Sequence, residues 1–454
     1  MRKPEIVFSP GALSKVLHDD LGLQPGTRLK VAYSGGIDSH ALLHALVRLR
    51  DAQGFSVQAI HVDHGLQPES GAWARHCREV CRQLHVPCTV ERIEVPRGSP
   101  DGMEAAARRA RYERLAGHVG AGELLLTAHH QDDQAETLLL QLLRGSGVHG
   151  MAAMPLVTPF SNGRLGRPLL GFSRRHLTDY ARSEGLSWID DRSNRDTRHT
   201  RNFLRQEIMP QLRTRWPEAG RVLARAARNA ADAAALLDES AALDLEDCRE
   251  TDAMNLSIKA LARLSDLRLR NLLRYWISRA GMQAPSRRRL QEIIGYIHRP
   301  TRSRQAVVSW PGAEVRRYRD SLQVMAPLPR FDTQLCLPWN PDHALVIPGT
   351  GYRLEAVTTP GAGLSQARIA AGQVSVRLRQ GGEACRLPGR AHRQKLKKLL
   401  QQSGTPPWQR QRLPLVYVGD ELAAVADRWV CEPFAAAPDE PGLVLRLRGV
   451  AAGT

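Results

Sequence analysis

Between residues 28 and 145, short apolar runs alternate four times with stretches that have the spacing of an amphipathic helix. The predicted strands cover residues 28–33, 57–62, 88–95 and 123–127, and the predicted helices cover residues 39–50, 70–84, 103–119 and 132–143. Strands that alternate with helices in this way form a parallel, Rossmann-like α/β sheet wrapped by helices. Ligands bind such sheets at the carboxyl ends of the strands, so we expect the functional residues there.

The sequence after this alternation changes character. Helical spacing over residues 221–245, 260–280 and 286–298 predicts a small all-helical domain. The stretches 374–379, 393–401, 415–418 and 422–426 predict a compact α+β unit at the end of the chain. We therefore predict a catalytic domain at 1–216, a helical domain at 217–325, a proline-rich linker with short strands at 326–372, and a C-terminal α+β domain at 373–454.

The chain is strongly basic, with a formal net charge of +18. Eleven arginines and two acids lie between residues 263 and 304, and ten basic residues and one acid lie between residues 374 and 412. A polyanion is the first partner that such a charge suggests, although basic surfaces that only keep a protein in solution are the alternative. We expect both basic regions to hold nucleic-acid phosphates.

The same composition limits where the protein works. No stretch approaches eighteen uninterrupted apolar residues, so we expect no membrane span. The first residues lack the apolar run of a secretory signal. Seven scattered cysteines indicate a reducing compartment and argue against a disulfide scaffold. We therefore expect a cytoplasmic protein, and the sequence does not decide between a monomer and a homodimer.

The segment SGGIDS at residues 34–39 directly follows the first predicted strand. Two glycines let the backbone turn sharply and point N–H groups inward, and the next helix adds the positive end of its dipole. We expect phosphate contacts from Ser34, Gly35, Gly36, Ile37, Asp38 and Ser39. Asp38 suits either a bound Mg²⁺ or the ordering of the loop. An ordinary serine-capped glycine turn is the structural alternative.

Two further segments belong to the same edge of the predicted sheet. HVDHGLQPES at residues 61–70 ends the second strand, and its histidines and aspartate lie too close together along a strand to converge on a metal. We therefore expect His61 and Asp63 to contact the nucleotide, beside the first loop across the switch point of the sheet. In EAAARRARY at 104–112, Arg108 and Arg111 share one helix face with Glu104, and a solvated ion-paired face explains this equally well.

The fourth segment, TAHHQDDQAET at residues 127–137, carries histidines and acids from a buried strand into a helix. Asp133 and Glu136 are three residues apart, so their carboxylates share a helix face that points back to the nucleotide site. A helix dipole accounts for one acid, usually Asp132, but poorly for the pair. Such a pair suits the binding of an ammonium group and the removal of its proton.

The fifth segment runs from Trp188 to Pro210 and ends the first domain. It holds more polar donors than a linker needs, among them Asn194 and Arg205, which we expect along the substrate path. Arg201 is suited to clamp phosphate with two hydrogen bonds.

SGGIDS resembles the PP-loop of the N-type ATP pyrophosphatases, which split ATP between its α and β phosphates. The whole set of segments resembles the tRNA(Ile)-lysidine synthase family. The matching residues are SGGIDS at 34–39, HVDHGLQPES at 61–70, E-x-x-A-R-x-x-R-Y at 104–112, TAHHQDDQAET at 127–137, LLRGSG at 142–147, GM at 150–151, RPLL at 167–170, the polar run at 188–210, and R-x-R-x-G-G-E at 377–383 with LKKLLQQSGTPPWQR at 396–410 and GDELAAVA at 419–426.

This resemblance implies ATP-dependent joining of free L-lysine to the wobble cytidine of an isoleucine tRNA with a CAU anticodon. An adenylated cytidine would form on the way, and AMP and pyrophosphate would be released. The resemblance also implies that His129 and Arg201 act near the adenylate and phosphates, and that Arg108 and Arg111 line the substrate path. The expected cofactors are ATP and Mg²⁺, and the helical and C-terminal domains are expected to bind tRNA.

Three alternatives share some of these features. A PP-loop tRNA thiolase is also basic and uses ATP, but it needs reactive cysteines or an iron–sulfur cluster, and this chain has no C-x-x-C. A non-catalytic RNA-binding protein with a relic nucleotide fold would not need the complete loop or the acid pair. Small-molecule ligases of the superfamily have no use for two basic C-terminal domains.

Overall fold

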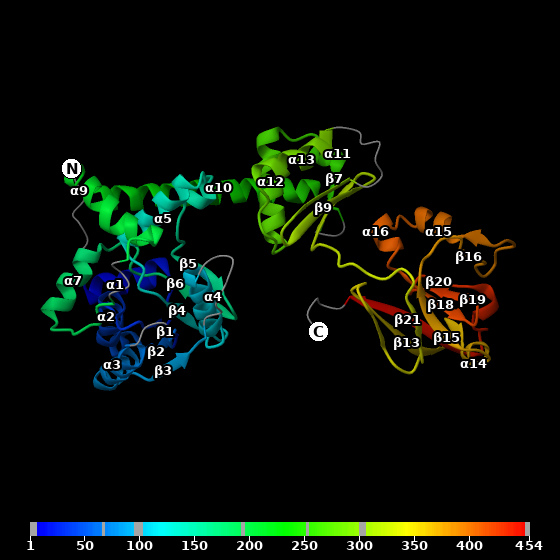
Figure 1. The fold of residues 1–454 in the computed structure, drawn as a ribbon, viewed down its shortest axis with the longest axis horizontal. Helices are drawn as coiled ribbons and strands as arrows, with labels where there is room; N and C mark the ends of the chain where they lie inside the picture. Colours follow the sequence, from blue (N-terminus) through cyan, green and yellow to red (C-terminus); the bar gives the residue numbers. More distant parts are fainter. Residues whose placement is uncertain are drawn as a thin grey trace. The chain divides into compact units, whose positions relative to one another are not determined.

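The computed structural model describes residues 7–65, 69–94, 103–191, 196–250, 254–298 and 306–449 (Figure 1). The chain divides into two compact units, residues 1–237 and residues 238–454. The division lies within the long helix α10 (Ala219–Cys248), and the finer boundary predicted at residue 216 stays a prediction. Within the described ranges, no helix has the length and apolar character needed to cross a membrane.

The first unit contains a six-stranded sheet in the order β3-β2-β1-β4-β6-β5. Its strands are β1 (Arg28–Ala32), β2 (Ser56–Asp63), β3 (Cys88–Arg92), β4 (Leu124–Leu126), β5 (Val157–Phe160) and β6 (Gly163–Gly166). All neighbours are parallel except β5, which runs antiparallel to β6. The four predicted strands are confirmed. The β5–β6 hairpin was not predicted, because two four-residue strands rich in Gly and Pro carry no apolar run.

Helices cover both faces of this sheet because alternate side chains of each strand point to opposite sides. The helices are α1 (Pro10–Lys15), α2 (Ile37–Gln53), α3 (Ser70–Gln83), α4 (Met103–Ala116), α5 (Gln131–Leu143), α6 (Val148–Met151), α7 (Arg174–Ser183), α8 (Thr200–Phe203) and α9 (Met209–Arg215). Val31 of β1 and Leu126 of β4 pack in one core with α1, α2, α3 and α7, whereas Leu125 packs with Leu115 of α4.

The strand order places the switch point of the sheet between β1 and β4. Successive strands β1, β2 and β3 extend the sheet in one direction, and β4 then pairs with the other side of β1. The segments that follow β1 and β4 therefore meet at this point, where α/β sheets bind ligands. The end of β2 also lies beside the loop after β1, but not across the switch point as the sequence analysis expects.

In the second unit, residues 255–325 fold into helices packed on a sheet. The helices are α11 (Ile258–Leu261), α12 (Asp266–Arg279) and α13 (Arg287–His298), and the strands are β7 (Asn255–Ser257), β8 (Ala306–Trp310), β9 (Ala313–Tyr318) and β10 (Ser321–Met325). The predicted helices are confirmed, with a break before α12, whose N-cap is Ser265. The expectation of helices alone is wrong, because Val308, Val315 and Leu322 form a sheet face that covers Trp276.

The last part of the chain forms two antiparallel sheets, in the orders β11-β15-β18-β19-β20 and β12-β13-β21-β14, beside a β16–β17 hairpin. The strands are β11 (Cys336–Pro338), β12 (Leu345–Ile347), β13 (Tyr352–Pro360), β14 (Leu364–Ser365), β15 (Val374–Leu378), β16 (Ala384–Cys385), β17 (Gln394–Lys395), β18 (Pro414–Val418), β19 (Glu421–Val425), β20 (Trp429–Val430) and β21 (Pro441–Gly449), with helices α14 (Gln366–Ala370), α15 (Leu396–Gln402) and α16 (Pro407–Arg410).

Residues 326–372 are therefore not a linker. β13 pairs with β21 along nine residues, and β11 pairs with β15, so this stretch supplies strands to both sheets of the C-terminal domain. The short strands were expected, but a sequence cannot show that their partners lie about forty residues later for β11 and more than eighty residues later for β13. One disulfide, which the sequence did not predict, joins Cys385 and Cys431 in the same domain.

Candidate active site

The loop at residues 34–36 joins the end of β1 to the first turn of α2. Gly35 has φ +82°, and a Cβ there would lie 2.6 Å from Ile189 Cδ1, so both conformation and space require glycine. The Ser39 hydroxyl donates to the Gly36 carbonyl at 2.9 Å and lies 3.1 Å from Ser34 Oγ. The loop is thus ordered by its own hydroxyls, with the positive end of a 17-residue helix behind it. Ile37 begins that helix and is buried.

A cavity of about 400 Å³ opens beside this loop. Its lining includes Ser34 and Gly36, the end of β2 with His61 and Asp63, the arginine Arg111, and the apolar side chains of Trp73 and Ile189. Its size and mixed lining suit a nucleotide. The structure thus brings four of the predicted segments together around one cavity, because Ile189 belongs to the segment that begins at Trp188.

The predicted residues of β2 are held in fixed positions. His61 is buried, and its Nδ1 donates to the Tyr33 carbonyl at 3.0 Å. Burial lowers the pKa of His61, so the imidazole is neutral near pH 7. Asp63 accepts a hydrogen bond from the Gly65 N–H at 2.8 Å, which shapes the turn after the strand.

The predicted residues of α4 divide between the cavity and its surroundings. Arg111 lines the cavity, and burial lowers its pKa. Arg108 stacks on the Tyr112 ring, with its guanidinium carbon 5.0 Å from the ring centre. Asn194 lies outside the described residues, and so does the side chain of Glu104.

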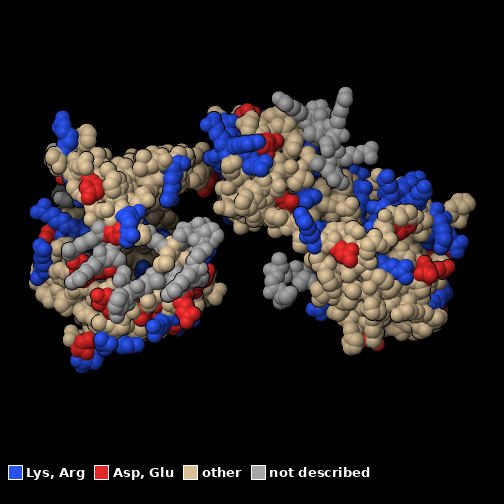
Figure 2. All heavy atoms as spheres, in the orientation of Figure 1, with Lys and Arg blue, Asp and Glu red and all other residues tan. Residues whose placement is uncertain are grey.

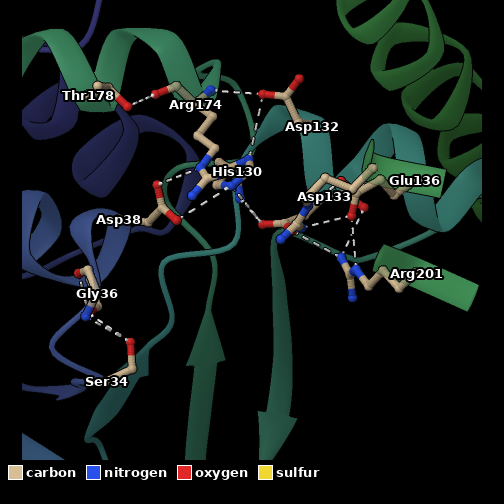
Figure 3. Close-up of polar contacts among 12 residues, drawn as sticks. Ser34, Gly36, Asp38, His130, Asp132, Asp133, Glu136, Arg174, Thr178 and Arg201 are labelled. Atoms are coloured by element: carbon tan, nitrogen blue, oxygen red, sulfur yellow. Dashed lines mark hydrogen bonds and ion pairs between the residues drawn. The ribbon is translucent and has the colours of Figure 1, made fainter. Parts of the chain in front are cut away.

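His130 connects the phosphate loop to the first turn of α5, and Figure 3 shows it between the two. Its Nε2 atom lies 3.7 Å from Asp38 Oδ2 and 3.3 Å from Asp133 Oδ2. Burial raises the pKa of Asp38, and His130 and Arg174 act against that rise. Asp38 Oδ1 is shielded from solvent and has no hydrogen-bond partner in the described part of the chain, although Arg174 Nε lies 4.0 Å away.

Asp133 and Glu136 lie on one face of α5, as their spacing predicts, but both are already paired with arginines. Arg201 Nη2 donates to Asp133 Oδ1 at 3.1 Å, and Arg201 Nε donates to Glu136 Oε2 at 3.0 Å. Arg205 makes the same two contacts, at 2.8 Å to Asp133 and 2.7 Å to Glu136 Oε1. Two carboxylates and two guanidiniums therefore form a nearly closed, charge-balanced cluster.

This cluster is buried, which sets its protonation. The Glu136 side chain is 2% exposed and that of Asp133 is 11% exposed. Burial alone would raise the pKa of Asp133, but His130 and Arg201 hold that pKa well below its usual range. The Asp133 carboxylate is therefore ionised throughout the physiological pH range, which makes it a strong cation ligand and a weak base.

The sequence analysis explained the neighbouring acid Asp132 by the helix dipole, and the structure adds contacts with two other helices. Its Oδ2 accepts a hydrogen bond from the backbone N–H of Arg174 at 2.8 Å, and its Oδ1 pairs with Arg213. These contacts join α5 to α7 and α9. A second cavity of about 730 Å³ borders this region and is lined by Asp132, Glu136, Arg174 and Arg205 among others.

The structure separates the roles of the two adjacent histidines. His129 lies 2.8 Å from Thr127 Oγ1 through Nδ1, and burial lowers its pKa to about 3, so it is neutral near pH 7. His130, and not His129, contacts Asp38 and Asp133. The sequence missed His130 and Arg174: the histidine pair was visible, but its spacing cannot decide which ring faces the acids, and Arg174 carries no motif.

Any metal bound here would have few protein ligands. The described residues contain no group of three or more His, Cys, Asp or Glu side chains placed to hold a metal ion. Asp38 offers a buried carboxylate oxygen beside the phosphate loop that has no hydrogen-bond partner among the described residues. That matches the preference of Mg²⁺ for one or two carboxylates together with phosphate oxygens and water.

The glycine loop at the switch point, with its nucleotide-sized cavity, defines a PP-loop nucleotide-binding protein. A family model described as a PP-loop domain matches residues 11–212. A TilS substrate binding domain matches residues 256–323, and a TilS substrate C-terminal domain matches residues 374–447.

Full-length relatives extend this match over nearly the whole chain. The tRNA(Ile)-lysidine synthase of Methylococcus capsulatus is 41% identical over 93% of this chain and 97% of its own length. Those of Alkalilimnicola ehrlichii and Coxiella burnetii are 43% and 39% identical, each over 96% of both chains. The chain therefore belongs to the tRNA(Ile)-lysidine synthase family of ATP-dependent ligases.

Proposed function

We propose that this protein uses ATP to join L-lysine to the wobble cytidine in the CAU anticodon of an isoleucine tRNA. The observation that carries the proposal is the buried pair Asp133 and Glu136, which His130 connects to the phosphate loop. A PP-loop protein that only bound RNA would not need a buried carboxylate pair beside its nucleotide cavity. The family assignment supports the same reaction, because its members carry this activity in their name.

In the first step, the oxygen on carbon 2 of cytosine attacks the α-phosphorus of ATP, and the bond to pyrophosphate breaks. The loop at residues 34–36 and the first N–H groups of α2 are suited to hold the phosphates while negative charge moves onto the pyrophosphate. His61, Asp63 and Arg111 line the cavity where the rest of the nucleotide would lie. The product is a cytidine whose oxygen now belongs to a good leaving group, AMP.

Mg²⁺ fits this arrangement through Asp38. Its Oδ1 atom is buried without a hydrogen-bond partner among the described residues, which is costly for a carboxylate unless a cation completes it. A bound Mg²⁺ would neutralise phosphate charge. The raised pKa of Asp38 shows that burial disfavours its charged form when no such cation is present.

In the second step, the ε-amine of lysine attacks carbon 2, and AMP leaves with the oxygen. We propose that Asp133 and Glu136 hold the ammonium group before it loses a proton. Asp133 is the anchor rather than the base, because its depressed pKa makes it a poor proton acceptor. Arg201 and Arg205 already contact both carboxylates, so lysine must share the cluster with them or displace one guanidinium.

The middle and C-terminal domains are proposed to hold the tRNA. Eight of the eleven arginines between residues 263 and 304 lie in the described part of the chain, and the basic stretch 374–412 lies in the C-terminal domain. Phosphate contacts of this kind would position the tRNA without reading its sequence. ATP and tRNA as substrates are also consistent with a cytoplasmic enzyme.

The test is lysine transfer by the full-length protein. Radiolabelled lysine, ATP and an isoleucine tRNA transcript with a CAU anticodon should give labelled tRNA, and nucleoside analysis should find the label on the wobble cytidine. The matched control is the same transcript with uridine at that position, which should stay unlabelled. Label on both transcripts, or on neither, would overturn the proposal, and sulfur transfer instead would favour the thiolase.

A further inference from the structure

The C-terminal domain contains a cavity of about 520 Å³ that is separate from the active site. Its charged lining consists of Arg379, Lys395, Lys397 and Arg410, with Glu383 as the single acid. These side chains come from the loop between β15 and β16, from β17, from α15 and from α16. Figure 2 shows Lys and Arg side chains gathered on the side of this domain that carries α15 and α16.

The one acid of this cavity is already used to build it. Glu383 Oε1 accepts hydrogen bonds from the backbone N–H groups of Gln380 at 2.7 Å and Gly381 at 2.6 Å. Its other oxygen lies 3.3 Å from Arg379 Nε. Glu383 therefore orders the glycine loop and balances Arg379, so three cations remain without an acid in the cavity wall.

The glycine loop keeps the cavity open. Gly381 and Gly382 have φ values of +108° and +90°, a conformation that residues with a Cβ rarely adopt. No atom lies within 4 Å of the position that a Cβ would take at either glycine. The chain thus passes the mouth of the cavity without placing a side chain over it.

The remaining cations differ in how firmly they are held. Arg410 is buried, and it donates through Nε to the Thr405 carbonyl at 2.6 Å and through Nη2 to Tyr318 Oη at 2.8 Å. Lys395 and Lys397 are exposed, and no acid within the described ranges lies within ion-pair distance of either one. A hydrogen-bonded, buried guanidinium together with two exposed ammonium groups is an arrangement that suits an anion with several oxygens.

We propose that this cavity binds a phosphate group of the tRNA substrate, together with the nucleotide that carries it. The volume is larger than one phosphate needs, and more of the lining is polar than apolar, with four cations in it, which suits an anion better than a hydrophobic ligand. The proposal rests on the proposed function, because it takes tRNA as the substrate. The phosphate is either the 5′-terminal group or an internal phosphodiester, and both share the same oxygen chemistry.

The test uses the full-length protein and compares two exchanges of lysine for glutamine. The double variant Lys395→Gln, Lys397→Gln should bind tRNA roughly tenfold more weakly, and the slope of log affinity against log salt should fall by about one to two. The matched control is Lys398→Gln, since Lys398 is exposed on the same helix but does not line the cavity. It should bind within about twofold of wild type.

A second comparison identifies the phosphate. If removal of the 5′-phosphate from the tRNA abolishes the difference between wild type and double variant, the cavity takes the terminal group. If the difference persists, the cavity takes an internal phosphodiester. Wild-type affinity and salt slope in the double variant, or an equal loss in Lys398→Gln, would overturn the proposal. Failure of the wild type to transfer lysine would instead count against the proposed function.

Discussion

The cluster around Asp133 and Glu136 and the cavity around Lys395 and Lys397 both gather positive charge, but in opposite surroundings. In the cluster, Arg201 and Arg205 each contact both carboxylates, and the acids are nearly excluded from water. In the C-terminal cavity, the one acid is used by the loop, and two exposed lysines have no acidic partner within the described ranges.

This difference determines what each region can do. Buried, paired charges lose much when one partner is removed, and salt hardly screens them, so they fix geometry at a reacting centre. Exposed, unpaired cations are held loosely and attract a polyanion over a distance that falls with salt. We therefore expect substitutions in the cluster to affect chemistry, and substitutions in the C-terminal domain to affect tRNA affinity and its salt dependence.

The largest expected effect is at Asp38, whose buried Oδ1 atom has no hydrogen-bond partner among the residues that the structure describes. Asp38→Asn should reduce tRNA adenylation by roughly 1000-fold or more. The variant lacks the carboxylate proposed to bind Mg²⁺, and without the ion the phosphate charge would not be neutralised at the loop. Binding of tRNA should survive, since the basic domains are unchanged. Pyrophosphate release measures adenylation, and filter binding measures the affinity for tRNA. Normal adenylation by this variant would rule out a role for Asp38 in this reaction.

The next largest effect is expected in the buried cluster itself. Asp133→Asn or Glu136→Gln should weaken the use of lysine by about 2–5 kcal/mol, roughly 30- to 4000-fold, because each change removes one of the two carboxylates proposed to hold the ammonium group. The use of ATP should change much less. Lysine dependence of transfer and ATP dependence of tRNA adenylation are the measurements.

A matched ion pair in the same unit provides the control for these variants. Glu184 pairs with Arg48 at 3.3 Å, and the Glu184 side chain is 32% exposed. Glu184→Gln should leave lysine use unchanged, because an exposed pair contributes little. If both cluster variants kept the wild-type Michaelis constant and turnover for lysine, Asp133 and Glu136 would not be the ammonium anchor.

Removal of the C-terminal domain tests the other side of the comparison. The cut belongs after Met325, the end of β10, because a cut at residue 373 would leave β11 and β13 without their partner strands. The shortened chain should bind tRNA roughly 100-fold more weakly at moderate salt, with a flatter salt dependence. Adenylation at high tRNA concentration should persist, and circular dichroism should show a folded chain. Equal affinity and salt slope would show that this domain does not hold tRNA.

The smallest effect concerns pH and the buried His129. Its folded pKa is about 3, below the ordinary 6.5, so the folded state binds fewer protons between these values. The stability contribution is complete above pH 6.5 and is lost as pH falls, by about 2 kcal/mol at pH 5. Hydrogen exchange in α5 during urea unfolding should show this loss in wild type but not in His129→Gln. The same pH dependence in both would contradict it.

The fold of the first unit was largely readable from the sequence, because each predicted strand and helix has its own hydrophobic period. β5 and β6 have no such period. The strands between residues 306 and 365 show only short β-like runs, which do not reveal the strands with which they pair. Those strands are defined by their partners, such as β21 for β13, and not by their own residues. This is why the middle domain was predicted as all-helical and why residues 326–372 were predicted as a linker.

The site shows the same division. Gly35 and the acids of α5 were found because both depend on local patterns. A glycine turn after a strand predicts a phosphate loop, and a spacing of three residues places two acids on one helix face. The contacts of Asp133 with Arg201 and Arg205 cross about seventy residues, and nothing in the sequence showed that the guanidiniums would occupy the carboxylates. The choice of His130 over His129 depends on the direction of two adjacent rings at the end of β4.

The sequence alone determined the class of sheet, the phosphate loop after its first strand and the family, because these depend on residues that are neighbours in the chain. The tertiary structure decided which charges are neutralised and which remain available. Glu383 could have balanced any of ten nearby cations, yet it turns inward to its own glycine loop and Arg379. The strength of a charge depends on its burial and on its partners in space, and only the folded chain sets those.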